Sequence, residues 1–292
     1  MDAEKCTTLL KVIELGSLSA AAAEIAYTPS GISRMVASLE HEVGFPLLIR
    51  GKGGVAPTAE CRQLMPAFTE LAAAQRTCET LAASIRGLEQ GVLTVGSAYP
   101  QFYRPLAGII ADFTAAHPGI HIDIVQANSS ALLERMEQHS MDFAIMSKRG
   151  KDHRWQPLIH DRMVAVLPSD HPLANKDSYP IERFTSEPFI DIYPGEESDN
   201  SRTLDANGVK PHARYTVHDT KAAFALVEAG LGITMMNDIY ARESTASIAT
   251  VPVSPFSAIE IGVATPRSTP SPALDAFRVF ALPRLTSQAA SR

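Results

Sequence analysis

The sequence predicts an α/β protein in three parts: an N-terminal winged helix-turn-helix, a linker helix and a two-lobed α/β domain. Three observations lead to this prediction. Two helix-start signals lie close together near the N-terminus, an apolar heptad follows residue 58, and strand-like runs alternate with helix-like runs from residue 91. Such alternation favours a mostly parallel sheet with helices on both faces.

Composition sets limits on the class of protein. The 292 residues suffice for two or three compact units, and 45% hydrophobic residues can form real cores. No run approaches the ~18 apolar residues of a membrane span, and the first residues lack a signal-peptide pattern. Three widely spaced cysteines indicate neither a disulfide framework nor a zinc site: Cys6, Cys61 and Cys78. We therefore expect a cytoplasmic protein with no membrane segment, metal or cofactor.

The stretch GSLSAAAAEIAYTPSGISRMVASLEHEVG, residues 16–44, carries both helix-start signals. Ser19 is expected to cap a short alanine-rich helix, and Thr28 to cap the next one. Pro29 then takes the first helical position, where its missing N–H costs nothing. A short helix, a tight turn and a longer helix ending near Gly44 is typical of a helix-turn-helix. The alternative is an ordinary helical hairpin inside a core.

The next stretch, FPLLIRGKGGVAPT, weakens that alternative. Two strand-like runs flank a Gly-rich tip, which predicts a β-hairpin wing carrying Arg50 and Lys52. Beside a helix-turn-helix, such a wing lets cations reach the DNA backbone or minor groove while the second helix enters the major groove.

Together these stretches resemble the LysR-type transcriptional regulators, in the order LLKVIELGSLSAAAAEIA, TPSGISRMVASLEHEVGFPLLIR and GKGGVAPT. The resemblance implies double-stranded DNA with a pseudo-palindromic promoter site as partner, bound through residues 1–57. The family usually has Gln-Pro at Pro29-Ser30 and often Arg at Ala20, so a usual base-reading Gln is lost. Base reading must then rest on Ser30, Ser33 and Arg34. The full expected DNA-binding set is Ser19, Thr28, Pro29, Ser30, Ser33, Arg34, Arg50 and Lys52.

The net charge of −6 argues against a generally basic surface. Nucleic-acid binders usually show a basic footprint. Here three cations, Arg34, Arg50 and Lys52, fall on the helix and the wing that would face DNA. Their position therefore matters more than the net charge of the chain. Few phosphate contacts per subunit predict that binding depends on oligomerisation.

A seven-residue repeat of apolar positions runs through residues 58–88. The narrow seam is typical of a coiled coil, whereas the alternative is a helix buried against its own domain. The family resemblance likewise implies a linker helix that pairs two subunits, with the effector domains pairing further to give a homotetramer. The expected dimerisation residues are Leu64, Leu71, Cys78, Leu81 and Ile85.

Residues 89–292 read as two α/β lobes. Strands at 91–98 and 120–126 and the run MDFAIMS belong to the first lobe, and MVAVLPS at 163–169 starts the second. IEIGVAT at 259–265 would cross back, followed by a helix from Pro272 to about Phe280. We expect lobe I over about 89–163 and 266–292, and lobe II over about 164–265. Two lobes joined by crossing strands resemble a periplasmic binding protein and the LysR-family effector domain.

Ligands of open α/β sheets bind beyond the carboxyl ends of strands, where helix N-termini offer free N–H groups. The polar loop 196–199 favours a cationic or neutral effector, or is a solvated face, whereas helix N-termini favour a small carboxylate. For each serine or threonine, the alternative is a helix cap without a ligand. The expected effector-binding residues are Ser97, Tyr99, Ser129, Ser147, Tyr193, Thr220 and Asn237.

Other classes of function fit less well. The sequence has no GxSxG, P-loop, HExxH or GxGxxG motif, so we do not expect an enzyme. A solute-binding protein would explain the two lobes but not the helix-turn-helix. A winged-helix regulator sensing an oxyanion such as molybdate is the nearer alternative. The prediction is a LysR-type regulator, a homodimer or homotetramer, whose promoter binding responds to a small-molecule effector, with RNA polymerase a further candidate partner.

Overall fold

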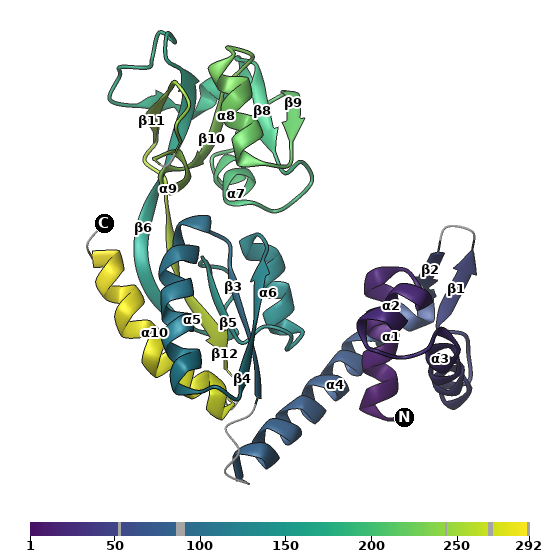
Figure 1. The fold of residues 1–292 in the computed structure, drawn as a ribbon. Helices are drawn as coiled ribbons and strands as arrows, with labels where there is room; N and C mark the ends of the chain where they lie inside the picture. Colours follow the sequence, from purple (N-terminus) through teal and green to yellow (C-terminus); the bar gives the residue numbers. More distant parts are fainter. Residues whose placement is uncertain (52–53, 86–90, 243, 268–270, 291–292) are drawn as a thin grey trace.

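The computed structural model describes residues 1–51, 54–85, 91–242, 244–267 and 271–290. They form an N-terminal domain, a long helix that leads away from it, and an α/β domain of two lobes (Figure 1). The predicted fold class is confirmed.

The N-terminal domain contains α1 (Ala3–Leu15), α2 (Leu18–Glu24) and α3 (Pro29–Val43). The cap of α2 is Ser17, whose Oγ accepts the Ala20 N–H at 3.2 Å. The prediction of Ser19 as the cap was therefore wrong: Ser17 has the extended backbone that a cap needs, and Ser19 lies inside the helix. Thr28 and Pro29 begin α3 as predicted.

The three helices pack their apolar faces together. Leu9, Ile32, Val36 and Leu39 are fully buried in this core, with Ala21 between them. The small alanine side chain lets the helices approach closely, which is the packing that the helix-turn-helix spacing requires.

The predicted wing is present as the antiparallel strands β1 (Leu48–Gly51) and β2 (Gly54–Pro57). It packs on the α1–α2 turn, where Val55 N–H donates to the Gly16 carbonyl at 2.8 Å. Gly54 has φ +112°, and a Cβ there would lie 2.5 Å from the Gly16 oxygen, so the position requires glycine. Glu40 of α3 accepts the Leu47 N–H and thereby ties the wing to that helix.

Helix α4 (Ala59–Ile85) follows directly. Its first turns belong to the N-terminal core, where Cys61 and Phe68 are buried and Leu64 is partly buried. Further along, Leu71 is 39% exposed and Cys78 is exposed. The side chains of Leu81 and Ile85 lie outside the described part of the chain.

The first lobe contains the parallel strands β3 (Gly91–Ser97), β4 (Ile120–Gln126) and β5 (Phe143–Ser147). Helices α5 (Tyr103–Ala116) and α10 (Pro272–Ala290) cover one face of this sheet, and α6 (Ser129–Glu137) covers the other (Figure 1). A 3-10 turn, Pro100–Phe102, precedes α5. Helix α10 runs ten residues beyond the predicted end at Phe280, since Leu285 also packs in the first-lobe core.

Two long strands connect the lobes: β6 (His153–Pro168) and β12 (Ala258–Pro266). They pair antiparallel over residues 153–162 and 258–266, and β12 also pairs with β5. The sequence predicted a strand only from residue 163, whereas β6 begins at His153. Pro157 breaks the expected pattern earlier, at a register shift opposite Ile261 and Gly262. A Cβ at Gly262 would lie 2.4 Å from the Gln156 carbonyl oxygen, so this crossing also depends on glycine.

The second lobe is built on the far end of β6. There β6 pairs with β10 (Thr234–Asn237) and β11 (Ile248–Ser254), and β11 pairs with β7 (Tyr179–Pro180). Strands β8 (Phe189–Ile192) and β9 (Ala213–Val217) form a separate parallel pair. The remaining elements are a 3-10 turn (Ile181–Thr185), α7 (Asp199–Ala206), α8 (Thr220–Glu228) and α9 (Asp238–Ala241).

Among the described residues, no single helix is long and apolar enough to cross a membrane. The bent pair α1 and α2 reaches the required length and composition only when taken together. Both helices contribute to the N-terminal core, which accounts for their apolar content.

Candidate functional site

The first candidate site is the exposed face formed by α3 and the wing. Ser30 and Arg34 are exposed on α3, and Ser33 between them is half-buried. Arg50 of β1 donates to the Ser33 Oγ at 3.3 Å, so helix and wing share one surface. These positions share a helix face because residues three and four apart are neighbours.

The described contacts of Thr28 are with its own helix end, and Pro29 and Ser19 lie in the first turns of α3 and α2. The Thr28 Oγ1 accepts the Gly31 N–H at 3.1 Å and lies 3.2 Å from the Ser30 Oγ. Pro29 and Ser19 are exposed, Ser19 in the first turn of α2. Lys52, also predicted to contact DNA, lies outside the described residues.

Ion pairs match two lysines of this domain with acids. Lys5 binds Glu42 at 2.6 Å, and Lys11 binds Glu24 at 2.5 Å. These pairs neutralise lysines against acids at a distance from the first turns of α3. Within the described part of the chain, Arg34 has no ion pair. The charge of Arg34 on the α3 face is therefore available to an external anion.

The second candidate site is a cavity of about 800 Å³ between the two lobes of the α/β domain. Of the residues predicted from the sequence, five line it: Tyr99, Ser129, Tyr193, Thr220 and Asn237. Ser97 and Ser147 are buried beside it instead. Ser97 Oγ accepts the Tyr99 N–H at 3.1 Å and so fixes the loop after β3.

Two helices direct their N-termini into this cavity. Their caps are not Ser129 and Thr220, the two hydroxyl residues for which capping was the alternative to ligand binding. Asn128 caps α6, accepting the Ala131 N–H at 2.8 Å, and Asp219 caps α8. Ser129 and Thr220 are the first residues inside these helices. Ser129 Oγ accepts the buried Ser147 N–H at 3.0 Å, which leaves its hydroxyl proton to donate.

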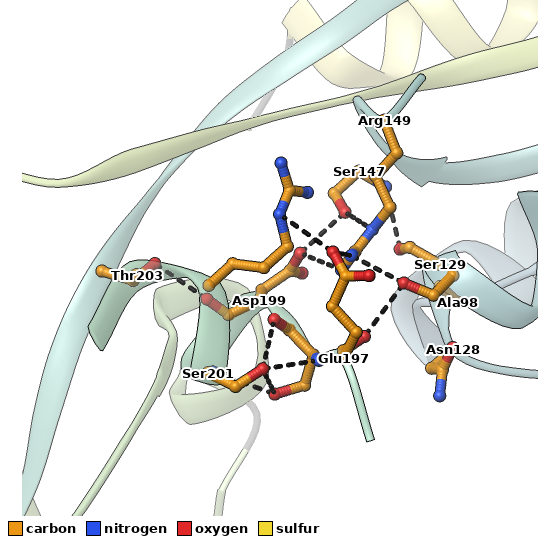
Figure 2. Close-up of polar contacts among 12 residues, drawn as sticks. Ala98, Asn128, Ser129, Ser147, Arg149, Glu197, Asp199, Ser201 and Thr203 are labelled. Carbon is orange, nitrogen blue, oxygen red and sulfur yellow. Dashed lines mark hydrogen bonds and ion pairs between the residues drawn. The ribbon is translucent and has the colours of Figure 1, made fainter. Parts of the chain in front are cut away.

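The most strongly bonded group beside the cavity is the Asp199 carboxylate, at the start of α7. Its Oδ1 accepts from Ser147 Oγ at 2.7 Å and from Arg149 Nη2 at 2.9 Å (Figure 2). Its Oδ2 accepts from Tyr99 Oη at 2.7 Å and lies 3.4 Å from Asn237 Nδ2. The Asp199 side chain is 10% exposed and that of Arg149 is 5% exposed.

Further contacts join the loop before α7 to the first lobe. Arg149 Nη1 lies 3.1 Å from Glu197 Oε1, and Asn128 Nδ2 donates to Glu196 Oε2 at 2.6 Å. Ser130 Oγ donates to the Glu197 carbonyl at 3.0 Å. The two lobes therefore meet through charged and polar side chains.

Burial also shifts titratable groups here. Burial, followed by the Asp199 carboxylate, raises the pKa of the Tyr99 phenol well above its usual value, so it remains a hydrogen-bond donor. Near the crossing strands, burial raises the pKa of Asp161 to about 6, although its carboxylate accepts the Ile239 N–H. Among the described residues, no group of three or more His, Cys, Asp or Glu side chains could hold a metal ion.

Arg149 and Asp199 were not among the predicted site residues, and loop 196–199 was interpreted as favouring a cationic or neutral effector or as a solvated face. Two signals could have found them. Ser198 and Ser201 form a capping box, which marks the start of α7 and places Asp199 in its first turn. Arg149 follows the carboxyl end of the buried strand β5, where ligand-facing residues gather in α/β sheets.

Comparisons with known proteins identify the two domains that carry these candidate sites. Residues 4–62 match the family described as bacterial regulatory helix-turn-helix protein, lysR family, and residues 86–286 match the LysR substrate binding domain. The uncharacterized HTH-type transcriptional regulator YvbU of Bacillus subtilis is 24% identical over 233 residues, 79% of each chain. A full-length OxyR variant from Pseudomonas aeruginosa superposes with TM-score 0.66 at 18% identity, covering 97% of each chain. Full-length CbnR in complex with its target DNA superposes with TM-score 0.60 at 18% identity, covering 97% of this chain and 100% of that one.

Proposed function

The chain belongs to the LysR family, and from this premise we propose how its parts divide the work of a DNA-binding transcriptional regulator. The N-terminal domain binds DNA and the α/β domain binds a small-molecule effector. The proposals concern the residues that carry each task.

For DNA, we propose that α3 lies in the major groove with Ser30, Ser33 and Arg34 toward the bases. Arg34 is exposed and free to contact guanine bidentately or to grip phosphate. Arg50, on strand β1 of the wing, contacts the DNA backbone. The support is the shared surface that the Arg50–Ser33 hydrogen bond creates.

For the effector, we propose the cavity between the lobes as the binding site. Its volume of about 800 Å³ falls within the ~300–1,000 Å³ of small-molecule sites. The observation that carries the proposal is that both lobes line it, Tyr99 and Ser129 from the first and Thr220 from the second. A ligand that contacts both lobes binds some relative positions of the lobes more tightly than others. It therefore shifts the protein toward the positions that it binds best.

We propose that the exposed part of α4, with Leu71 and Cys78, pairs with the same helix of a second copy. Leu64 contributes less to such a pairing, because it packs partly on the N-terminal core. A tetramer formed through the α/β domains, and contact with RNA polymerase, extend this proposal on the family resemblance alone. Light scattering on Leu71→Asp tests it: an unchanged oligomer would contradict pairing through α4.

The LysR family is one of transcriptional regulators. We further propose that the cleft binds its effector without chemical change. Ser147 Oγ donates to Asp199, and Ser129 Oγ accepts a backbone N–H. These bonds show neither hydroxyl paired with a histidine base, which is the arrangement that activates a serine nucleophile.

A thermal-shift screen of small metabolites on the full-length protein tests the effector site, since a ligand of the native state raises its melting temperature. Each stabilising compound is then added to gel shifts on the DNA upstream of the protein's own gene. We expect at least one compound to change both the melting temperature and the DNA complex. Binding that persists unchanged when Thr220 and Tyr193 are replaced would place the effector outside the cavity.

A further inference from the structure

Tyr99, Ser147, Arg149 and Asn237 surround one carboxylate with hydrogen-bond donors. We call these four residues the anion cradle. Three of them come from the first lobe, after β3 and at the end of β5, and Asn237 comes from the end of β10 in the second lobe. Two hydroxyls, a guanidinium and an amide are the donors that a protein uses to bind a small carboxylate ion.

The carboxylate in the cradle belongs to the chain itself. Asp199 lies in the second lobe, yet Tyr99 Oη and Ser147 Oγ each donate to it at 2.7 Å from the first lobe. Its partners are far away in the sequence, Tyr99 by 100 residues and Arg149 by 50. Asp199 therefore occupies a built anion site, three of whose four donor residues belong to the opposite lobe.

We propose that Asp199 is a tethered carboxylate ligand, which fills the anion cradle and holds the two lobes together before an effector arrives. The effector then binds in the remaining cavity as a neutral or cationic molecule. This inference rests on the proposed function, because it takes the cavity between the lobes as the effector site.

The charges around the cavity support this ligand class. Asp199 already matches the charge of Arg149. Apart from Arg149 and Asp199, the described lining of the cavity holds one lysine, Lys221, and one histidine, His218. Against them stand the acids Glu196, Asp219 and Glu228. An effector carboxylate that entered the cradle would also have to displace Asp199 and would share Arg149 with Glu197. Placing like charges together in a partly buried site is unfavourable, so the geometry disfavours an anionic effector.

A rescue experiment on the full-length protein tests the proposal. Asp199→Ala removes one carboxylate group, which formate can replace, and Asp199→Gly also leaves room for acetate. We expect the melting temperature of each variant to fall by roughly 5–10 °C, because Arg149 is left buried beside Glu197 alone. Sodium formate should restore roughly 3 °C or more at saturation relative to sodium chloride at the same ionic strength.

Matched controls separate the cradle from a general effect of charge. The wild type should not respond to formate, because its cradle is filled. Asp205→Ala removes the same charge from an exposed position of α7 and should neither lose stability nor respond. Asp199→Asn should be destabilised without rescue, since the amide still occupies the space.

Acetate should stabilise Asp199→Gly more than Asp199→Ala, where the remaining methyl group crowds the acetate methyl. A variant that accumulates in soluble form only with formate also counts as rescued. Failure of formate and acetate to stabilise or recover either variant would overturn the proposal, as would equal stabilisation of the wild type.

The proposed function has a separate readout. Gel shifts with the wild type and Asp199→Ala, without added formate or acetate, test DNA binding. Failure of the wild type to bind DNA specifically would contradict the proposed function and leave the formate result standing. Intact DNA binding with failed rescue would contradict the tethered ligand alone.

Discussion

The α3 surface proposed to bind DNA and the cavity between the lobes use arginine in opposite ways. Arg34 is exposed on α3 and has no ion pair within the described residues, so its charge is available to a phosphate or a base. Arg149 is 5% exposed and its charge is matched inside the protein by Asp199 and Glu197. The difference between them is that the arginine of one surface is open to an external anion, whereas the arginine of the other already binds carboxylates of the chain itself.

The largest expected effect is on the buried side of the comparison. Arg149→Met leaves the Asp199 carboxylate buried without its cation, and breaking such a pair costs about 3–5 kcal/mol. Urea unfolding of the α/β domain should show this loss. The matched control Arg34→Met removes an exposed cation and should change the free energy of unfolding by no more than about 0.5 kcal/mol. Equal effects of the two substitutions would remove the contrast between the surfaces.

A second buried carboxylate, Asp161, lacks the arginine pairing that Asp199 has. Because burial raises its folded-state pKa from 3.8 to about 6, the unfolded state loses this proton first. The contribution of Asp161 to the free energy of unfolding is therefore fully present below about pH 4 and is lost as the pH rises through 6. The loss is at most about 3 kcal/mol, since one pKa unit corresponds to about 1.4 kcal/mol.

Asp161→Asn removes this titration and keeps an oxygen that can accept the Ile239 N–H. We expect the variant to gain stability over the wild type at pH 7.5 and to lose that advantage at pH 4. Chemical denaturation at both pH values measures the difference. A constant difference between the two proteins across this range would contradict the role of Asp161.

The exposed side of the comparison predicts effects on DNA affinity. Arg34→Ala should cost about 1–3 kcal/mol of specific binding if Arg34 contacts guanine. Arg50→Ala should weaken binding to all sequences and reduce the salt slope by about one. Gel shifts at two salt concentrations measure both. Lys11→Ala is the control, because Lys11 is paired with Glu24 and Glu14 away from α3; a loss equal to that of Arg34→Ala would refute the assignment.

The same comparison explains how far the sequence could predict the sites. The α3 face follows from local signals, since Thr28 caps and Pro29 begins the helix within a few residues of Ser33 and Arg34. In the N-terminal domain Ser19 was predicted as a cap in place of Ser17, because the two residues are the same type and lie only two positions apart. The cradle depends on contacts between residues 38 to 100 positions apart. Local signals mark the start of α7 at Asp199 and the end of β5 before Arg149, but no local pattern shows that these two residues meet across the lobes.

The smallest expected effects concern the hydroxyls that face the cavity. Ser129→Ala and Thr220→Val should each cost about 0.5–1.5 kcal/mol of effector binding if the hydroxyl donates to a neutral ligand. Their effects on stability should differ, because the caps are Asn128 and Asp219. Ser129→Ala leaves the buried Ser147 N–H unpaired and should destabilise the apo protein by about 1–3 kcal/mol. Thr220→Val should leave apo stability almost unchanged. Ligand titrations with parallel melting curves measure both quantities, and a normal effector response in both variants would mean that neither hydroxyl binds the ligand.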